Sequence, residues 1–411
     1  MVYLRYLIMA NKPRIRFRGF TEDWEQRKLG DIATFSKGNG YSKSDLAPSG
    51  DPIILYGRLY TNYETTIRNV DTFVELKDKS VISQGDEVIV PASGETVEDI
   101  SRASVVKDQG VIIGGDLNVI KVNHLLDPTF LALTISNGEQ QKELSKRAQG
   151  KSVVHLHNSD LQEVNLTFPL LNEQKEISTL FEKMDSIITL HQCKLKKLNL
   201  AKKSLLQKLF PRNGSQIPGV RFKGFTDAWE QRKLGDLYKR VNERNDGTLG
   251  RDKWISVAKM YFQDPDKVQS NNLDTRTYVM KKGDIAFEGH PNNEFKFGRF
   301  VLNDIGTGII SELFPIYRPI TEYDLDFWKY AIQLERVMAP ILAKSITSSG
   351  NSSNKLDHNH FLNKELLVPN IEEQKKIGTL LSLLSKNITL HQRKLERLQE
   401  VKKGLLQKMF V

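Results

Sequence analysis

The stretch Glu173–Phe210, EQKEISTLFEKMDSIITLHQCKLKKLNLAKKSLLQKLF, decides how this chain of 411 residues is organised, because the sequence contains it twice. The stretch Glu373–Phe410 repeats it with identical residues at 21 of 38 positions. Apolar residues recur in both copies at alternating steps of four and three, which is the spacing of a coiled-coil seam. Each copy therefore predicts one helix of about 57 Å, and two matching seams in one chain favour packing of the two helices against each other.

The predicted seam carries polar residues at the same two places in both copies. The central seam positions are Ile177, Met184, His191, Leu198 and Leu205 in the first helix, and Ile377, Leu384, His391, Leu398 and Leu405 in the second. Each histidine lies in the pentapeptide ITLHQ. We interpret the two histidines as a polar pair that fixes the register of the helices, since a metal or catalytic site would need more ligands than the seam supplies.

Composition narrows the class of protein. The chain is too long for one core, so two or more domains are expected. One cysteine, Cys193, excludes an internal disulfide framework and a cysteine-based zinc site, which favours a cytoplasmic protein. No apolar run approaches the roughly 20 residues that span a bilayer, so no membrane partner is expected.

The net charge of +10 is concentrated in the two predicted helices. Residues 173–210 carry +4 and residues 373–411 carry +6, so the rest of the chain sums to zero. Lysine-rich outer faces are normal for a solvated coiled coil. The alternative is a surface for a polyanion or a partner protein along the helices.

A second repeat opens each half of the chain. Arg16–Asp31 reads RFRGFTEDWEQRKLGD and Arg221–Asp236 reads RFKGFTDAWEQRKLGD, with 13 of 16 residues identical. Near-identity predicts that both copies dock on the same kind of surface. Nothing in the segment pairs a nucleophile with a base, so it is not a catalytic motif.

The two repeats divide the chain into tandem halves. Between them lie dissimilar blocks with short β-rich runs, including Glu87–Val90 and Leu313–Tyr317, and with late helical patterns at Pro128–Arg147 and Asp324–Lys344. Asn172 is a plausible N-cap of the first long helix. The fold class expected is α+β, with two β-rich domains in tandem, each followed by a long helix, and the helices forming an antiparallel coiled coil with pseudo-twofold symmetry. The expected divisions are a disordered leader (1–13), a first domain (14–172, head 1), a first helix (173–210), a linker (211–220), a second domain (221–372, head 2) and a second helix (373–411).

These paired openings, the paired helix starts PLLNEQKEI and PNIEEQKKI, and the tandem of about 200 residues resemble the specificity subunit of type I restriction–modification systems. The resemblance covers residues 14–411. It implies that each head recognises one half of a split, asymmetric site in double-stranded DNA. It also implies two methyltransferase subunits and restriction or motor subunits as partners, with S-adenosylmethionine, ATP and Mg on those partners and no cofactor on this chain.

Candidate enzyme motifs do not hold together in the sequence. Gly150-Lys151-Ser152 lacks the preceding glycine of a phosphate-binding loop, and His358-Asn359-His360 lacks the supporting ligands of a nuclease. His155 and His157 have no neighbouring cluster of further ligands. The chain is therefore expected to be non-catalytic, with no metal site.

DNA readout requires polar side chains on exposed loops. Three segments in each head stand at comparable places, after expected strands or before the long helix. The residues expected to contact DNA are Arg58, Tyr60, Ser93, Lys151 and Ser152 in head 1, and Lys259, His290, Asn292, Asn293, Asn351 and Ser352 in head 2. Each of these loops also fits an ordinary solvated turn. Two rival functions stay open: a coiled-coil adaptor without DNA readout, and a nuclease or methyltransferase that acts alone.

Overall fold

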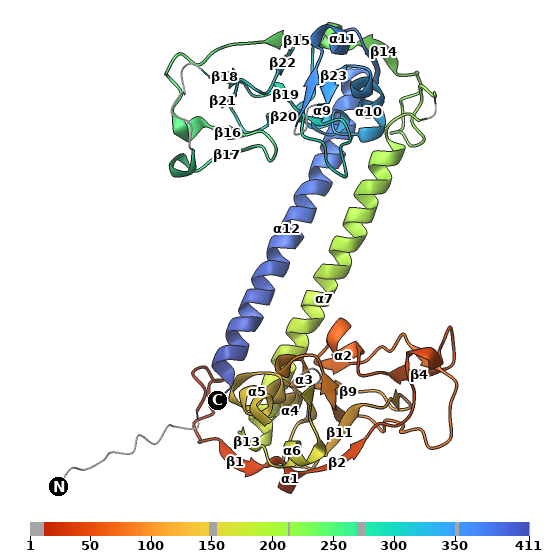
Figure 1. Ribbon diagram of the computed structural model, residues 1–411, viewed down its shortest axis with the longest axis vertical. Helices are drawn as coiled ribbons and strands as arrows, with labels where there is room; N and C mark the ends of the chain where they lie inside the picture. Colours follow the sequence, from red (N-terminus) through yellow and green to blue (C-terminus); the bar gives the residue numbers. More distant parts are fainter. Residues whose placement is uncertain (1–11, 148–153, 213, 269–275, 350–352, 411) are drawn as a thin grey trace, which may run out of the picture. The chain divides into compact units, whose positions relative to one another are not determined.

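The computed structural model describes residues 12–147, 154–212, 214–268, 276–349 and 353–410, apart from the side chains at positions 97, 98, 348 and 349 (Figure 1). The chain forms two compact units: the first runs to Gln192 and adds the chain from Arg393 onward, and the second comprises Cys193–Gln392. Each unit contains one strand-rich head and part of both long helices, α7 (Leu171–Lys208) and α12 (Ile371–Met409). The expected α+β fold with a long helix after each head is confirmed.

Head 1 is built on two sheets. The five-stranded sheet has the order β2-β11-β7-β9-β5 and the four-stranded sheet the order β10-β4-β6-β3, with the pairs β1-β13 and β12-β8 beside them. The strands are β1 (Glu25–Lys28), β2 (Ala33–Lys37), β3 (Leu46–Ala47), β4 (Asp51–Ile54), β5 (Thr66–Ile67), β6 (Phe73–Val74), β7 (Glu87–Pro91), β8 (Ser93–Gly94), β9 (Ser104–Val106), β10 (Ile112–Ile113), β11 (Leu117–Val122), β12 (Val154–His155) and β13 (Asn165–Phe168). The helices are α1 (Leu29–Ile32), α2 (Arg58–Thr61), α3 (Val97–Ile100), α4 (Pro128–Ile135), α5 (Gly138–Arg147) and α6 (Asn158–Gln162).

Head 2 has a four-stranded sheet of order β15-β22-β19-β20 and the pairs β14-β25, β16-β17, β18-β21 and β23-β24. Its strands are β14 (Glu230–Lys233), β15 (Tyr238–Val241), β16 (Ile255–Ser256), β17 (Tyr261–Phe262), β18 (Thr277–Met280), β19 (Ile285–Glu288), β20 (Arg299–Leu302), β21 (Gly308–Ser311), β22 (Ile316–Pro319), β23 (Ile346–Ser349), β24 (Asn354–Leu356) and β25 (Glu365–Val368). Its helices are α8 (Leu234–Leu237), α9 (Leu325–Ala331), α10 (Glu335–Ala343) and α11 (His358–Leu362).

The late helical patterns are helical as expected, and each is divided into two helices, α4 with α5 and α9 with α10. The first division lies just before Gly138, whose φ of 72° suits glycine. Two other expectations about local structure were wrong. The strand expected from Leu313 begins at Ile316, because Ser311–Phe314 forms a hydrogen-bonded turn. Helix α7 begins before Asn172, so Asn172 lies inside it, whereas Asn370 accepts a hydrogen bond from the backbone N–H of Glu373 in α12.

The near-identical openings of the two halves clamp the first turns of the long helices. Arg16 donates through Nε and Nη2 to the carboxylate of Glu173, at 2.8 and 2.6 Å, and its Nη1 donates to the carbonyl of Glu22. Arg221 makes the same two bonds to Glu373 at the same distances. Both glutamates are 1% exposed. The segment is repeated because both copies dock on the same kind of helix start, as the sequence led us to expect.

Each opening also packs on the end of the other long helix. Trp24 meets Phe130 edge-on, and Phe130 contacts Phe410 at the end of α12. In the second unit Trp229 meets Phe327 edge-on, and Phe327 stacks on Phe210, just beyond α7, with 5.5 Å between ring centroids. The core of each head is therefore completed by both long helices.

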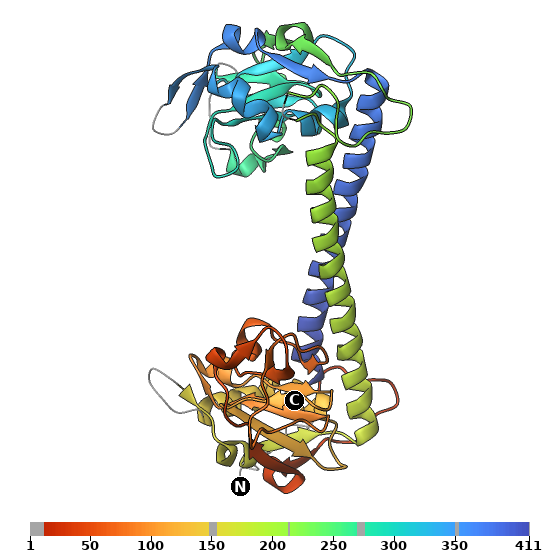
Figure 2. The same cartoon turned by 90° about the vertical axis from the view of Figure 1, so that its right-hand side faces the viewer.

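The two long helices lie side by side and antiparallel within each unit (Figures 1 and 2). In the first unit Asp185 of α7 pairs with Lys402 of α12. Phe181 lies about one turn before Asp185, and it contacts Phe410, which follows Lys402 in the chain. Earlier positions in α7 thus meet later positions of the second helix, as the antiparallel arrangement requires. The ten central seam positions are all buried or half-buried, and Cys193 is exposed. Among the described residues, no helix is both long and apolar enough to span a bilayer.

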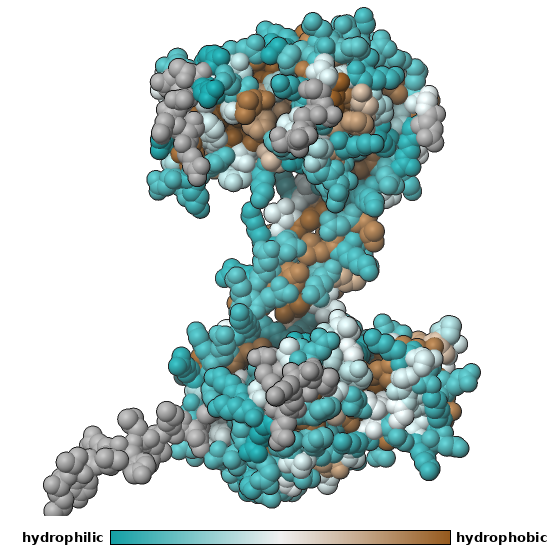
Figure 3. Space-filling view, viewed as in Figure 1, coloured by the Kyte–Doolittle hydropathy of each residue, from teal (hydrophilic) through white to brown (hydrophobic). Residues whose placement is uncertain are grey.

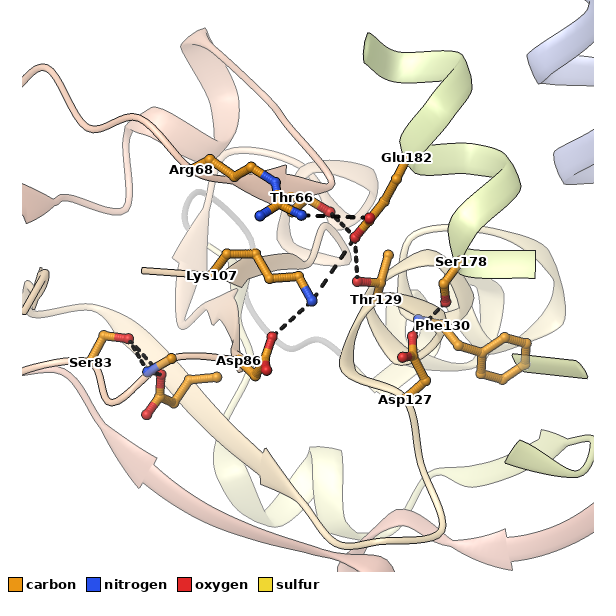
Figure 4. A network of polar contacts seen from close by, with 12 residues as sticks. Thr66, Arg68, Ser83, Asp86, Lys107, Asp127, Thr129, Phe130, Ser178 and Glu182 are labelled. Atoms are coloured by element: carbon orange, nitrogen blue, oxygen red, sulfur yellow. Dashed lines mark hydrogen bonds and ion pairs between the residues drawn. The ribbon is translucent and has the colours of Figure 1, made fainter. Parts of the chain in front are cut away.

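Helix α7 is also attached to head 1 through the carboxylate of Glu182 (Figure 4). That carboxylate accepts hydrogen bonds from Thr129 at 3.0 Å and from Thr66 at 3.4 Å, and Arg68 approaches it at 3.6 Å. The equivalent position in α12 is Ser382, which is buried. The two heads are thus fixed to their helices by different side chains, although the surrounding frame is shared.

Lys202 and Lys402 occupy equivalent positions in the two long helices, but replacing each with methionine is expected to affect stability differently. Lys402 pairs with Asp185, whereas Lys202 lies over the ring of Tyr330, 5.2 Å from its centroid, and no ion pair between Lys202 and a described carboxylate is found. Burial, followed by the nearby charge of Lys329, lowers the pKa of Lys202 below 10.5. We expect Lys402→Met to reduce the free energy of unfolding by about 1 kcal/mol, and Lys202→Met to leave it unchanged or raise it.

The pH dependence of unfolding checks this difference. Between the lowered pKa in the folded state and 10.5 in the unfolded state, the unfolded chain binds more protons at Lys202. The wild-type chain therefore gains stability relative to Lys202→Met as the pH rises through that window. Chemical denaturation of the wild-type chain and both variants at neutral and alkaline pH measures the free energies of unfolding. A Lys202→Met variant that is less stable than Lys402→Met at neutral pH would contradict the expected difference between the two lysines.

Candidate nucleic-acid interface

Two of the three loop segments of head 1 meet in the structure, and the third lies outside the described residues. The hydroxyl of Tyr60 donates to the backbone carbonyl of Ser93 at 2.5 Å, which joins the segment after β4 to β8. Strand β8 pairs antiparallel with β12, so Ser93 lies opposite His155 and Gly94 opposite Val154. Lys151 and Ser152 lie outside the described residues. One end of head 1 therefore gathers the segment after β4 and the strands β8 and β12.

Several side chains in this cluster are held by head 1 itself. Arg58 is 11% exposed, and its guanidinium donates to Asp71 at 2.7 Å, to Glu64 at 2.8 Å and to the carbonyl of Asn69 at 3.0 Å. The hydroxyl of Ser93 donates to Asp116. Burial raises the pKa of Tyr60, so it stays a neutral donor. These groups shape the loops, and their contact with DNA stays a prediction.

A cavity of about 880 Å³ opens beside the same loops. Tyr41, Tyr56 and Arg58 are among its lining residues, together with Asp116, the acceptor of the Ser93 hydroxyl. Tyr56 is 40% exposed and meets the ring of Tyr60 edge-on. Among the described residues of head 1, the exposed aromatic ring is that of Tyr56, one turn before Tyr60, which the sequence singled out.

Head 2 gathers its loops through Arg299. The guanidinium of Arg299 donates to Glu288 at 2.8 Å and to the carbonyl of Ala258 at 2.7 Å, which fixes the turn after β16 against the hairpin of β19 and β20. The backbone N–H of Asn354 donates to the carbonyl of Gly289 at 2.8 Å, which brings the start of β24 to the same place. A Cβ at Gly289 would lie 2.2 Å from the carbonyl oxygen of Asn354, so this approach requires glycine.

The residues of head 2 singled out from the sequence are exposed at this end. Lys259, Asn292 and Asn293 are exposed, and His290 is 57% exposed with Nδ1 3.6 Å from Glu288. The side chain of Asn292 accepts hydrogen bonds from the backbone N–H groups of Glu294 and Phe295, which fixes the turn. Asn351 and Ser352 lie outside the described residues.

Comparison with known proteins shows what this chain is similar to. Residues 21–200 match the family model for the type I restriction modification DNA specificity domain. The chain is 21% identical to the type I restriction enzyme MjaVIII specificity subunit of Methanocaldococcus jannaschii, in an alignment that covers 94% of this chain and 91% of the relative. The chain is therefore similar to type I restriction specificity subunits, in agreement with the resemblance found in its sequence. Specificity subunits of this family are non-catalytic, as the resemblance had implied.

The fold agrees with a solved member of the specificity family. The crystal structure of the type I restriction–modification S subunit from M. genitalium aligns with a TM-score of 0.60 at 15% identity, and covers 97% of this chain and 99% of that one. At this identity the likeness concerns the fold alone. It extends over both heads and both long helices.

The candidate enzyme motifs have structural roles where they are described. Asp357 caps α11 by accepting from the N–H of His360, and His358 Nδ1 lies 2.7 Å from the hydroxyl of Tyr317. Burial lowers the pKa of His358. The rings of His155 and His157 stack in parallel at 6.3 Å. Within the described ranges, no group of three His, Cys, Asp or Glu side chains is placed to hold a metal ion.

The residues that assemble the loops were not predicted from the sequence. Arg299 and Glu288 stand opposite each other on adjacent strands of the hairpin, and the pairing emerges once the register of β19 and β20 is known. Leu313 was assigned to a strand, yet it is 82% exposed in a turn. The tetrapeptide Glu312–Pro315, which ends in proline, was the available sign of that turn.

Proposed function

We propose that this chain is the DNA-recognition subunit of a type I restriction–modification complex and that it binds a bipartite, asymmetric site in duplex DNA. Head 1 recognises one half-site and head 2 the other. Methyltransferase subunits, two per complex, dock on the chain and methylate adenine with S-adenosylmethionine. Restriction subunits that use ATP and Mg complete the complex.

One observation carries the proposal. The two heads share the Arg–Glu clamp and the Trp–Phe packing, yet the described loops that each head gathers at one end differ in sequence. Two domains that recognise different half-sites require a common scaffold that carries loops of different sequence. Backbone-positioning and base-reading contacts to DNA both come from polar loop side chains.

The helices offer a surface for the methyltransferase partners. Apolar side chains are exposed along α7 and α12 among lysine-rich polar ones, and Figure 3 shows brown atoms on the visible face of the helices. The large exposed ones are Ile187, Leu190 and Val401 in the first unit and Leu200, Leu383 and Leu390 in the second. Leu190 and Leu390 occupy equivalent positions in the repeat. Exposed apolar residues rimmed by polar ones are typical of protein–protein contact.

Salt titration of DNA binding tests the proposal. The full chain, alone and with its methyltransferase subunits, is mixed with labelled duplexes that contain or lack the methylated site. We expect affinity for the site to exceed affinity for other duplexes, and the logarithm of the binding constant to fall linearly with the logarithm of salt concentration. Absence of sequence preference under all conditions would favour the rival function of a protein–protein adaptor.

The chain alone is expected to be inert. Purified full chain incubated with DNA, S-adenosylmethionine, ATP and Mg should transfer no methyl groups and cut no DNA, whereas adding the methyltransferase subunits should restore adenine methylation. Methyl transfer from labelled S-adenosylmethionine measures this. Methylation or cleavage by the chain alone that persists after further purification would contradict the proposed division of labour.

A further inference from the structure

Leu313 is the most exposed large apolar residue among those described, at 82%. It lies in the turn between β21 and β22, and the turn is firmly built. The N–H of Phe314 donates to the carbonyl of Ser311 at 3.1 Å, and the N–H of Leu313 approaches the hydroxyl of Ser311 at 3.3 Å. The turn therefore holds the side chain of Leu313 out in solvent.

Charged and apolar anchors stabilise the turn on both sides of Leu313. The carboxylate of Glu312 lies 3.1 Å from Arg244 and 3.5 Å from Arg276. Phe314 packs on the apolar cluster that contains Ile310 and Ile316. Because the flanking residues are fixed, Leu313 loses little conformational freedom if it enters a binding partner.

Strand register places Leu313 among the candidate DNA-reading loops of head 2. In the antiparallel pair of β19 and β22, Ile285 lies opposite Tyr317 and Ala286 opposite Ile316, and Phe287 donates to the carbonyl of Pro315. Leu313, which precedes β22, therefore lies at the same end of the sheet as Gly289 and His290, which follow β19.

The turn after β16 reaches the same end. Trp254 and Ile309 form a parallel bridge, so β16 and β21 run in the same direction, toward Lys259 and toward Leu313. Met260 and Phe314, which follow these two residues, pack against the same apolar cluster. Single exposed leucines are common on protein surfaces, but this one stands on a rigid turn beside two polar loops already proposed to face DNA.

We propose that Leu313 is an apolar wedge that inserts between adjacent base pairs of the half-site bound by head 2. The inference rests on the proposed function, because it requires head 2 to bind duplex DNA. Apolar side chains that enter base steps unstack them and kink the duplex, so a site is selected partly by how easily it deforms. Head 2 then discriminates through a flexible base step in addition to the polar loop contacts.

Leu313→Ala in the full chain tests the wedge, with Ile320→Ala as the matched control. Ile320 is 48% exposed and lies beyond the opposite end of β22. The chain and its methyltransferase subunits are bound to duplexes that carry 2-aminopurine at successive positions of the second half-site, excluding the adenine that is methylated. We expect one position to gain fluorescence several-fold with the wild-type chain and with Ile320→Ala.

Leu313→Ala should abolish that gain and weaken binding by about tenfold, with an unchanged thermal midpoint. Binding that prefers the site but unstacks no step would overturn the wedge and leave the proposed function standing. Equal fluorescence with Leu313→Ala would also overturn the wedge. If Leu313→Ala weakens binding but the wild-type chain unstacks no base step, Leu313 contacts the surface of the DNA and does not insert, which would overturn the wedge. Failure of the wild-type complex to prefer its site would overturn the proposed function, and the wedge with it.

Discussion

Replacing Glu373 with glutamine is expected to lower the thermal midpoint of the second unit by about 6–12 °C. The carboxylate of Glu373 is 1% exposed and accepts two bonds from Arg221 and a third from the indole N–H of Trp229 at 3.2 Å. Glutamine keeps the shape but leaves the guanidinium buried without its counter-charge. Removing one partner of a buried ion pair costs about 3 kcal/mol or more.

The adjacent glutamate supplies the control. Glu372 is 68% exposed and pairs with Lys375 three residues later, so Glu372→Gln should shift the midpoint by no more than about 1 °C. Glu173→Gln should destabilise the first unit in the same way, although Trp24 Nε1 has no hydrogen-bond partner among the described residues. Thermal unfolding followed by circular dichroism separates the variants. Equal midpoints for Glu373→Gln and Glu372→Gln would show that the clamp does not hold the head on its helix.

Adding one heptad to each long helix is expected to widen the gap between the two half-sites by about three base pairs. The insertions go between His191 and Leu198 and between His391 and Leu398, where a heptad preserves the seam spacing of both helices. Seven residues lengthen a helix by roughly 10 Å, and base pairs are spaced about 3.4 Å apart. The bases read should stay the same, because neither insertion touches a head.

A heptad in one helix alone should weaken assembly, because the two seams no longer match. Methylation mapping in cells that express each variant measures the gap directly. If the gap between the half-sites stays the same with the paired insertion, the helices dock partner subunits and do not set the spacing of the half-sites. Docked methyltransferases can absorb part of the lengthening, so a gap widened by one or two base pairs still supports the prediction.

The sequence was sufficient for those parts of the fold that depend on local periodicity. The apolar spacing predicted both long helices to within two residues of α7 and α12 at each end. Gly378 is needed because a Cβ there would lie 2.4 Å from the carboxylate of Asp324. Apolar spacing could not predict this requirement, since Asp324 is 54 positions earlier in the sequence. The clamp between Arg16 and Glu173 spans 157 positions, and its trace in the sequence was that both halves keep the same arginine and the same glutamate.

The candidate site was predicted at the level of segments but not of side chains. Strand ends and turns placed three loops in each head, and the structure brings those described together. Which groups face outward depends on pairing across the fold. Arg58 resembled a free cation in the sequence, yet two carboxylates on neighbouring loop turns hold it. Leu313 was read as a strand residue, because an apolar residue before Phe-Pro fits a strand as well as a turn.

Exchange of one head followed by adenine-methylation mapping tests the central claim most directly. Residues 36–149 are replaced with the same block from a relative, which leaves the clamp, the long helices and head 2 intact. We expect one half of the methylated site to change to the relative's sequence while the other half stays the same. A change in both halves, or in neither, with a folded and assembled complex would contradict independent reading by two heads.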